Sequence, residues 1–263
     1  LLNTSLLYKI KDNKLYFDTL ILNFYKKVLK IKNKVTIIIP VFNEKKYIEK
    51  IIKSLKKNLN LKKQIIVVDD FSSDGTRNII KKIKNIDKIV FHKKNLGKGA
   101  AIKSAIPYIK GDIVAIQDAD LEYNPKDLNK LIKILISKNL KVIYGSRVLN
   151  KKRYNNKFIS NFRTFGNHIL TLISNFLNDQ KLSDAHTCYK IFKSEIFLKL
   201  NIKEKDFAFC PEVNTKISLL NENIIEEPIS YTGRTVEEGK KISFYDAIRA
   251  LITILKYKYF VKF

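Results

Sequence analysis

The sequence predicts an α/β protein with a Rossmann-like, mostly parallel sheet and helices on both faces of that sheet. Two observations support this fold class. Short apolar runs rich in β-branched residues recur along the first half of the chain, and segments of helical length separate them. The chain has 263 residues, of which 45% are hydrophobic, so it is long enough to bury a large core. Disorder and disulfide-dependent folding are therefore poor explanations of this composition.

The elements of the first half follow one another in a regular order. Five β-branched residues at 35–39 precede Pro40, as expected of a strand buried on both faces of a sheet, and a helix is expected from about 44 to 57. Strands separated by helices form right-handed βαβ units, so the sheet is expected to be parallel. The same alternation predicts further strands at 64–69, 88–91, 113–117 and 142–144, with helices that begin near 74, 97 and 125.

The pattern changes after residue 145. An asparagine-rich segment precedes an amphipathic helix that ends near 176, a further strand is expected at 224–229, and we interpret this half as an acceptor-side elaboration of the same domain. Lysine and tyrosine residues border the last helix, as is typical of helices that lie on a bilayer surface, and packing on the sheet is the alternative. We divide the chain into an N-terminal helical extension (1–33), one domain (34–242) and a C-terminal amphipathic helix (243–263).

Lysine dominates the charge of the chain. Lys and Arg number 51 against 25 Asp and Glu, a formal charge of +26, yet only six of the 51 are Arg. Because the lysines are spread along the whole chain, we interpret them as solvated surface and expect no nucleic-acid partner, while an anionic membrane surface would also attract such a chain. No run of 18 apolar residues is present, so the expected location is cytoplasmic, peripheral on the inner face of a membrane. The printed sequence begins without Met, which leaves an upstream anchor open.

Acidic residues follow three of the predicted strands. The carboxyl ends of parallel strands meet at one edge of a sheet, and ligands bind there in folds of this type. Clustered carboxylates repel one another unless a cation lies among them, and Mg²⁺ or Mn²⁺ prefers such oxygen ligands. Taken singly, these motifs are also compatible with a capped turn or with chance. The residues are Glu44 after the first strand, Asp69 and Asp70 after the second, and Asp118 and Asp120 after the fourth.

A glycine-flanked lysine lies between these segments. Gly97 and Gly99 surround Lys98 at the expected start of a helix. Glycines permit close backbone approach, a helix N-terminus attracts anions, and the lysine can reach a phosphate. The spacing of a Walker loop is absent, so this motif alone is weak.

Together, the segments PVFNE, VVDDFSSDGT, NLGKGAA and QDADLEY resemble the family 2 nucleotide-sugar glycosyltransferases with the GT-A fold. The resemblance is to the branch that transfers mannose or glucose to polyprenyl (dolichyl) phosphate, and it extends over about 35–260. It implies inverting, metal-dependent transfer of a hexose from GDP-mannose or UDP-glucose to dolichyl or undecaprenyl phosphate, with Mg²⁺ or Mn²⁺ as cofactor. The alternatives are transfer to a sugar hydroxyl in polysaccharide or glycan synthesis, and a non-catalytic basic protein that binds RNA or membrane.

The resemblance also implies roles for individual residues. Asp118 and Asp120 match the metal-binding DxD motif, and Glu122 stands where relatives of the mannosyltransferase type often place Gln as a further ligand. Retained arginines in a lysine-rich chain suggest a need for the planar guanidinium, which grips phosphate with two donors. Arg147 and Arg163 match positions that hold the acceptor phosphate, and Arg234 and Lys240 lie on a loop that closes over the donor diphosphate. The other implied donor-binding residues are Pro40, Phe42, Glu44, Asp69, Asp70 and Lys98.

The acceptor class decides whether a general base is needed. A sugar hydroxyl must lose its proton as it attacks, whereas a phosphate monoester is already an oxyanion at neutral pH. We therefore assign no general base for a phosphate acceptor, and Glu212 is the candidate if the acceptor is a hydroxyl. The base and sugar of the donor and the oligomeric state stay open.

Overall fold

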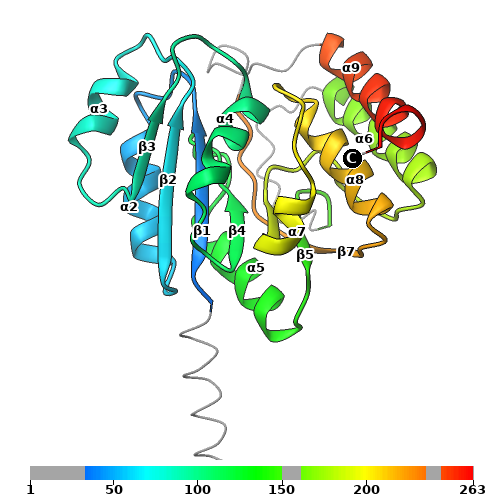
Figure 1. Cartoon of the computed structure of the whole chain (residues 1–263), viewed down its shortest axis with the longest axis horizontal. Coiled ribbons are helices and arrows are strands. Elements are labelled where there is room, and N and C mark those ends of the chain that lie inside the picture. Colours follow the sequence, from blue (N-terminus) through cyan, green and yellow to red (C-terminus); the bar gives the residue numbers. More distant parts are fainter. Residues whose placement is uncertain (1–32, 150–160, 235–243, 263) are drawn as a thin grey trace, which may run out of the picture.

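The computed structural model describes residues 33–149, 161–234 and 244–262 (Figure 1). In this part of the chain, seven strands form one sheet in the order β3-β2-β1-β4-β6-β5-β7. The predicted N-terminal extension and Lys240 lie outside the described residues. The strands are β1 (Val35–Val41), β2 (Lys63–Asp69), β3 (Lys88–Phe91), β4 (Ile113–Ile116), β5 (Val142–Ser146), β6 (Lys190–Lys193) and β7 (Ile224–Pro228).

The pairing of the strands confirms a mostly parallel sheet. β1 pairs in parallel with β2 and β4, β2 pairs in parallel with β3, and β5 pairs in parallel with β7. β6 is antiparallel to both β4 and β5, and the sequence pattern did not reveal it. This strand has only four residues and begins with the buried Lys190, so it lacks the continuous apolar run that marks the other central strands.

Helices cover both faces of the sheet, as predicted. The helices are α2 (Ile48–Asn58), α3 (Thr76–Lys82), α4 (Lys98–Ala105), α5 (Pro125–Ser137), α6 (Asn161–Asn178), α7 (Ser194–Lys199), α8 (Phe209–Leu219) and α9 (Phe244–Leu255), with a 3₁₀ turn at Ile106–Tyr108 and a π-helical turn at Lys256–Phe260. Successive residues of β1 point to opposite faces, so Ile37 packs in the core with α2, α3 and α5, and Ile38 packs in the core with α4, α7 and α8.

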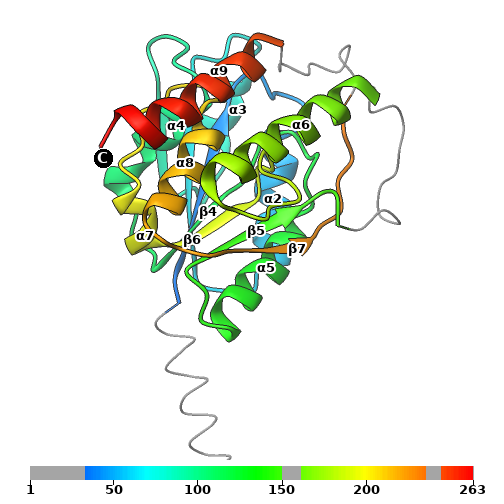
Figure 2. The same ribbon diagram turned by 90° about the vertical axis from the view of Figure 1, so that its right-hand side faces the viewer.

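Two helices lie outside these layers. α6 and α9 pack against each other and against α8, as Figure 2 shows, and not directly on the sheet. The predicted C-terminal helix therefore forms, but it covers another helix. No helix in the described ranges is long and apolar enough to cross a membrane.

The register brings the carboxyl ends of the central strands together. Val41 at the end of β1 is paired with Asp69 at the end of β2. On the other side of β1, Ile38 is paired with Ile116, and Gln117 continues the ladder by donating to the Ile38 carbonyl. Asp118 and Asp120 thus leave the sheet beside the loop that carries Glu44.

Candidate active site

Three of the predicted acidic residues, Glu44, Asp120 and Glu122, converge on a single guanidinium group. Arg234, which follows β7, donates from Nη1 and Nη2 to the two carboxylate oxygens of Glu44, both at 3.1 Å. Nη2 also donates to Asp120 Oδ2 at 3.2 Å. The Arg234 side chain is 15% exposed, so the cluster lies at a partly open edge of the sheet. Residues 190 positions apart in the sequence are therefore neighbours in space.

Asp120 lies in an electrostatically unfavourable position. Burial, then the nearby carboxylates of Asp118 and Glu122, raise its pKa to about 7, although Arg234 acts in the opposite direction. Its Oδ1 accepts the backbone N–H of Glu122 at 3.1 Å, which fixes the turn after β4. Close carboxylates that resist ionisation are the expected condition of a site built for an additional cation.

Asp118 has a different partner. Lys98 Nζ donates to Asp118 Oδ1 at 2.6 Å and to Cys188 Sγ at 2.8 Å. Burial alone would lower the pKa of Lys98, but the Asp118 carboxylate outweighs it and raises that pKa well above its usual value, so the ammonium stays charged. The glycine-flanked lysine and the DxD motif, which are separate in the sequence, therefore form one ion pair.

The glycines around Lys98 have a packing role. A Cβ on Gly97 would lie 2.4 Å from the Lys205 carbonyl oxygen, and one on Gly99 would lie 2.3 Å from that of Glu204. Gly97 also has a φ of +93°, which disfavours other residues. The close approach that these glycines permit is thus to the backbone before α8, a partner that the motif around Lys98 does not reveal.

Asp70 holds the loop that carries Lys98. Its Oδ1 accepts the backbone N–H of Leu96 at 2.8 Å, and its Oδ2 accepts that of Gly97 at 2.7 Å. His92 Nδ1 lies 2.7 Å from Oδ1, and its Nε2 lies 2.9 Å from Ser104 Oγ. The structure therefore places Asp70 against the start of α4, and its donor-binding role stays a prediction.

Asp69 supports the neighbouring loop. It is fully buried, and its Oδ2 accepts the Ser72 N–H at 3.2 Å and Arg77 Nε at 2.7 Å. Arg77 also donates to the His92 carbonyl at 2.6 Å. His92 and Arg77 were not among the predicted site residues, although the rarity of arginine in this chain could have drawn attention to Arg77.

The loops after β1 and β2 are joined by hydrogen bonds. Asn43 N–H donates to Ser72 Oγ at 2.9 Å, and Glu44 N–H donates to Thr76 Oγ1 at 3.0 Å. These bonds hold the backbone of Glu44 in place. Pro40 and Phe42 are partly exposed at the end of β1, beside these loops.

Glu122 fastens the segment after β7 to the turn after β4. Its Oε1 accepts the backbone N–H of Arg234 at 2.8 Å, its Oε2 accepts the Tyr231 hydroxyl at 2.7 Å, and its carbonyl accepts the Thr232 N–H at 3.0 Å. A β-bridge between Tyr123 and Tyr231 adds to this contact. Glu122 thus positions Arg234 in the structure.

The predicted ligand set is therefore not assembled as a group of three. Among the described residues, no three His, Cys, Asp or Glu side chains are grouped to hold a metal ion. Asp118 and Asp120 nevertheless suit Mg²⁺ or Mn²⁺, because these ions bind through one or two carboxylates and complete their shell with water and substrate phosphates. The raised pKa of Asp120 agrees with a pair of oxygen ligands that a divalent ion would stabilise.

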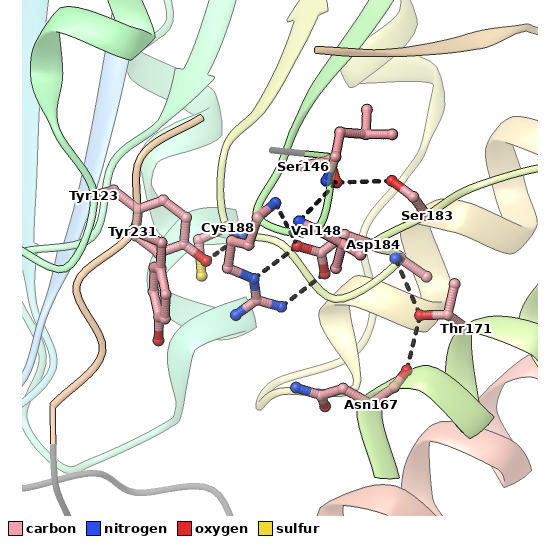
Figure 3. Close-up of polar contacts among 12 residues, drawn as sticks. Tyr123, Ser146, Val148, Asn167, Thr171, Ser183, Asp184, Cys188 and Tyr231 are labelled. Atoms are coloured by element: carbon pink, nitrogen blue, oxygen red, sulfur yellow. Dashed lines mark hydrogen bonds and ion pairs between the residues drawn. The ribbon is translucent and has the colours of Figure 1, made fainter. Parts of the chain in front are cut away.

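Arg147, which was predicted to hold the acceptor phosphate, is itself held by a carboxylate. Its Nε and Nη2 each donate to Asp184 at 2.7 Å, and its guanidinium lies 5.2 Å from the centre of the Tyr231 ring. Figure 3 shows Asp184 between the two tyrosines and the helix that carries Asn167. The hydroxyl of the neighbouring Tyr123 accepts a hydrogen bond from the Cys188 N–H at 3.1 Å. Arg163 lies in α6, but its side chain is outside the described part of the structure.

Glu212 is not available as a general base. It is fully buried, its Oε1 accepts Lys216 Nζ at 2.6 Å and the Lys203 N–H at 2.7 Å, and its Oε2 accepts the Glu204 N–H at 2.9 Å. This burial disfavours Glu212 as the candidate base of the hydroxyl-acceptor alternative, and that role stays a prediction. Nothing in the sequence around Glu212, which follows Cys210 and Pro211, indicates that its carboxylate binds backbone N–H groups.

Comparisons with known proteins agree with this geometry. A family model described as glycosyl transferase family 2 matches residues 36–200. The chain is 32% identical over 173 residues to an uncharacterized protein of Methanocaldococcus jannaschii, covering 64% of this chain and 68% of the relative. It is 28% identical over 229 residues to the UDP-N-acetylglucosamine–dolichyl-phosphate N-acetylglucosaminyltransferase of Methanococcus voltae, covering 78% of this chain and 89% of that protein.

Two further matches are to a relative of lower sequence identity and to a solved enzyme structure. The dolichyl-phosphate beta-glucosyltransferase of Trichomonas vaginalis is 24% identical over 245 residues, which is 87% of this chain and 74% of the relative. The crystal structure of glucosyl-3-phosphoglycerate synthase from Mycobacterium tuberculosis with Mn²⁺, UDP and phosphoglyceric acid aligns with a TM-score of 0.64 at 17% identity, over 87% of this chain and 80% of that one. A second structure of that enzyme holds Mg²⁺ and UDP. The GT-A fold predicted from the motifs is thereby confirmed.

Proposed function

Because the chain belongs to glycosyl transferase family 2, we propose that this glycosyltransferase moves a hexose from a nucleotide-sugar to a polyprenyl phosphate, with inversion at the anomeric carbon. Two of the named relatives act on dolichyl phosphate, which supports a lipid-phosphate acceptor. One relative's name contains UDP-N-acetylglucosamine, and the aligned structures contain UDP. A UDP-sugar is therefore the first donor to test, and GDP-mannose is the alternative.

The observation that carries the acceptor class is the environment of Glu212. A hydroxyl acceptor needs a carboxylate base beside it, whereas a phosphate acceptor needs only cations that hold two anions side by side. Glu212 is sealed in a buried contact with Lys216, while Arg147 presents a guanidinium on the acceptor side. This combination favours a phosphate nucleophile over a sugar hydroxyl.

The proposed reaction is a direct displacement. An oxygen of the acceptor phosphate attacks the anomeric carbon as the bond from that carbon to the donor diphosphate breaks, and the nucleoside diphosphate leaves with the bonding electrons. Asp118 and Asp120 would hold Mg²⁺ or Mn²⁺, which supplies stabilisation of the charge that develops on the leaving group. Arg234 adds a second positive charge at the same edge, within 3.2 Å of Asp120.

The remaining residues position these groups. Glu122 holds the backbone of Arg234, and Asp70 holds the loop that carries Lys98. Asp184 would orient Arg147, whose planar group can bind the acceptor phosphate only if its direction is fixed. Arg163 is proposed to help Arg147 to hold the acceptor phosphate, and Lys240 is proposed to help Arg234 to hold the donor diphosphate. An acceptor of this kind places the enzyme at a membrane surface, and we propose that it works on the inner face.

The test is release of UDP from UDP-glucose and UDP-N-acetylglucosamine, measured with and without polyprenyl phosphate. Release is expected only when both the lipid phosphate and Mg²⁺ or Mn²⁺ are supplied. GDP-mannose is run in parallel to identify the base. Equal turnover with soluble sugar alcohols in place of the lipid phosphate would contradict the proposal.

A further inference from the structure

The helix α6 is amphipathic in the reverse sense. Its most buried side chains are polar, with exposed fractions of 1 to 3%, namely Thr171, Ser174 and Asn178. Among its described side chains, His168 is exposed and polar, and the other exposed ones are large and apolar: Ile169 is 39% exposed, Leu172 is 54% exposed and Phe176 is 86% exposed. A helix on the surface of a protein in water normally shows the opposite arrangement. The solvent-facing side of α6 therefore resembles a face that is covered.

Internal hydrogen bonds fix this orientation. Asn175 exchanges two bonds with the backbone of Leu182, from Nδ2 to the carbonyl at 2.7 Å and from the Leu182 N–H to Oδ1 at 2.9 Å. Thr171 Oγ1 accepts the Ala185 N–H at 3.4 Å. The apolar residues of α6 cannot turn inward without breaking these bonds, so their exposure is a built feature.

The neighbouring helix α9 repeats the outward apolar side. Ala250, Thr253 and Ile254 are buried against the protein, whereas Ile248 is 43% exposed and Ile252 is 58% exposed. α6 and α9 lie side by side on the same outer side of the molecule in Figures 1 and 2. We call this surface the outer face of α6 and α9, and it comprises the exposed apolar residues Ile169, Leu172, Phe176, Ile248 and Ile252.

The charge of the chain changes at this surface. Charged residues make up 29% of the whole sequence, but the 18 residues of α6 and the 12 of α9 contain only Arg163, Asp246 and Arg249. Beyond these helices the exposed Asp179 is followed by the exposed Lys181, and after α9 Lys262 is exposed and Lys258 is partly exposed. An apolar face with a lysine border fits the interior and the headgroups of an anionic bilayer, because the side chains enter the first and the ammonium groups meet the second.

We propose that the outer face of α6 and α9 docks on an anionic lipid bilayer. The docking itself does not depend on the proposed function. Only its role does, since docking through α6 would bring a lipid-linked phosphate to the acceptor side. The polar side of α6 contacts the segment that carries Asp184, and Asp184 holds Arg147. One helix thus links the bilayer on its outer side to the proposed phosphate-binding arginine on its inner side.

The experiment is co-sedimentation of the full chain with vesicles of phosphatidylcholine and phosphatidylglycerol, and with vesicles of phosphatidylcholine alone. The double variant Leu172→Glu/Phe176→Glu is compared with Leu198→Glu, because Leu198 on α7 is 51% exposed and lies outside the outer face. We expect the double variant to lose roughly tenfold or more of its binding to the anionic vesicles, since each buried apolar side chain contributes at least that factor. Leu198→Glu should bind as the unsubstituted chain does.

Circular dichroism and thermal melting verify that both variants fold. Unchanged vesicle binding by the double variant would overturn the inference, and so would equal binding to neutral and anionic vesicles. The inference would also fail if the unsubstituted chain is a dimer that Leu172→Glu/Phe176→Glu dissociates, because a second copy would then cover the face. Turnover on a short, water-soluble polyprenyl phosphate should be retained by the double variant. If the unsubstituted chain shows no turnover on any lipid phosphate, the proposed function fails while the sedimentation result still decides the docking surface.

Discussion

Buried charges serve different purposes in the two halves of this molecule. In the donor half, from β1 to the turn after β4, Asp118 and Asp120 lie at the partly open carboxyl edge of the sheet, where they meet Lys98 of the same half and Arg234 from the segment after β7. In the acceptor half, Lys190 and Lys216 are fully buried and donate to backbone carbonyls of Ala185 and Leu200. At this carboxyl edge the carboxylates are paired with cations beside the proposed donor site, whereas these two buried lysines satisfy irregular backbone.

This difference follows from the architecture. Regular βαβ units pair their own backbone groups, so polar side chains are needed only where the strands end. The segment between α6 and β6 and the segment between α7 and α8 have no such ladder, and side chains must take over. Neutralising a charge should therefore reduce activity in one half and stability in the other.

The largest expected effect is on the donor half. Asp120→Asn should reduce turnover by about 10³-fold, because the residue loses both its charge and one oxygen that can bind a metal ion, in a site where charge stabilisation dominates catalysis. The measurement is UDP release at saturating lipid phosphate and Mn²⁺. Asp179→Asn, at an exposed position after α6, is the matched control. Full activity of Asp120→Asn would show that the convergence of carboxylates at this edge is not the site.

The second prediction concerns the acceptor half. Glu212→Gln removes the carboxylate that faces Lys216 in a fully buried pair, and breaking such pairs typically costs about 3–5 kcal/mol of unfolding free energy. Thermal melting and urea titration measure this loss. Turnover per folded molecule should stay within about twofold, because a phosphate acceptor needs no base.

The outcome of that substitution also separates the two acceptor classes. A variant that keeps its stability but loses turnover would mean that Glu212 acts as a base on a hydroxyl. Glu222→Gln, at an ion pair with the 53% exposed Lys141, is the control, and it should leave the melting temperature nearly unchanged because solvent screens such pairs.

The third prediction tests the contact by which Glu122, after β4, holds Arg234, after β7. Glu122→Ala removes the acceptors of the Arg234 N–H and the Tyr231 hydroxyl, so Arg234 should lose its fixed position beside the donor site. We expect an increase of about tenfold in the KM for the nucleotide-sugar, corresponding to one lost charged hydrogen bond, with little change for the lipid phosphate. Glu122→Gln keeps two polar atoms at these positions and should restore most of the affinity. A larger effect on the acceptor KM would contradict a positioning role.

How far the sequence predicts the structure differs between the same two regions. The strands of the donor half and the meeting of their carboxyl ends could be predicted, because β-branched runs and the geometry of parallel sheets determine both. The contact between Arg234 and Glu44 could not be derived from spacing, since it depends on how the segment after β7 returns across the sheet. Strand β6 and the role of Glu212 were missed for a different reason. Both depend on buried lysines, which a hydrophobic pattern does not reveal.

The smallest expected effect is on the pH dependence of stability in the metal-free chain. Burial and the neighbouring carboxylates raise the pKa of Asp120 to about 7 in the folded state, from 3.8 as its ordinary value. The folded state therefore binds this proton more tightly than the unfolded state, and the free energy of unfolding should fall as the pH rises from about 4 to about 7. Thermal melts of the chain in EDTA measure this fall, and Asp120→Asn, which cannot titrate, should reduce it and melt at a higher temperature at pH 8. Addition of Mn²⁺ should recover stability for the unsubstituted chain and not for the variant, because the ion favours the ionised carboxylate. If the melting temperature of metal-free Asp120→Asn falls with rising pH as much as that of the unsubstituted chain, Asp120 is not the group that titrates. The repulsion between carboxylates would then not be concentrated at Asp120 in the donor half.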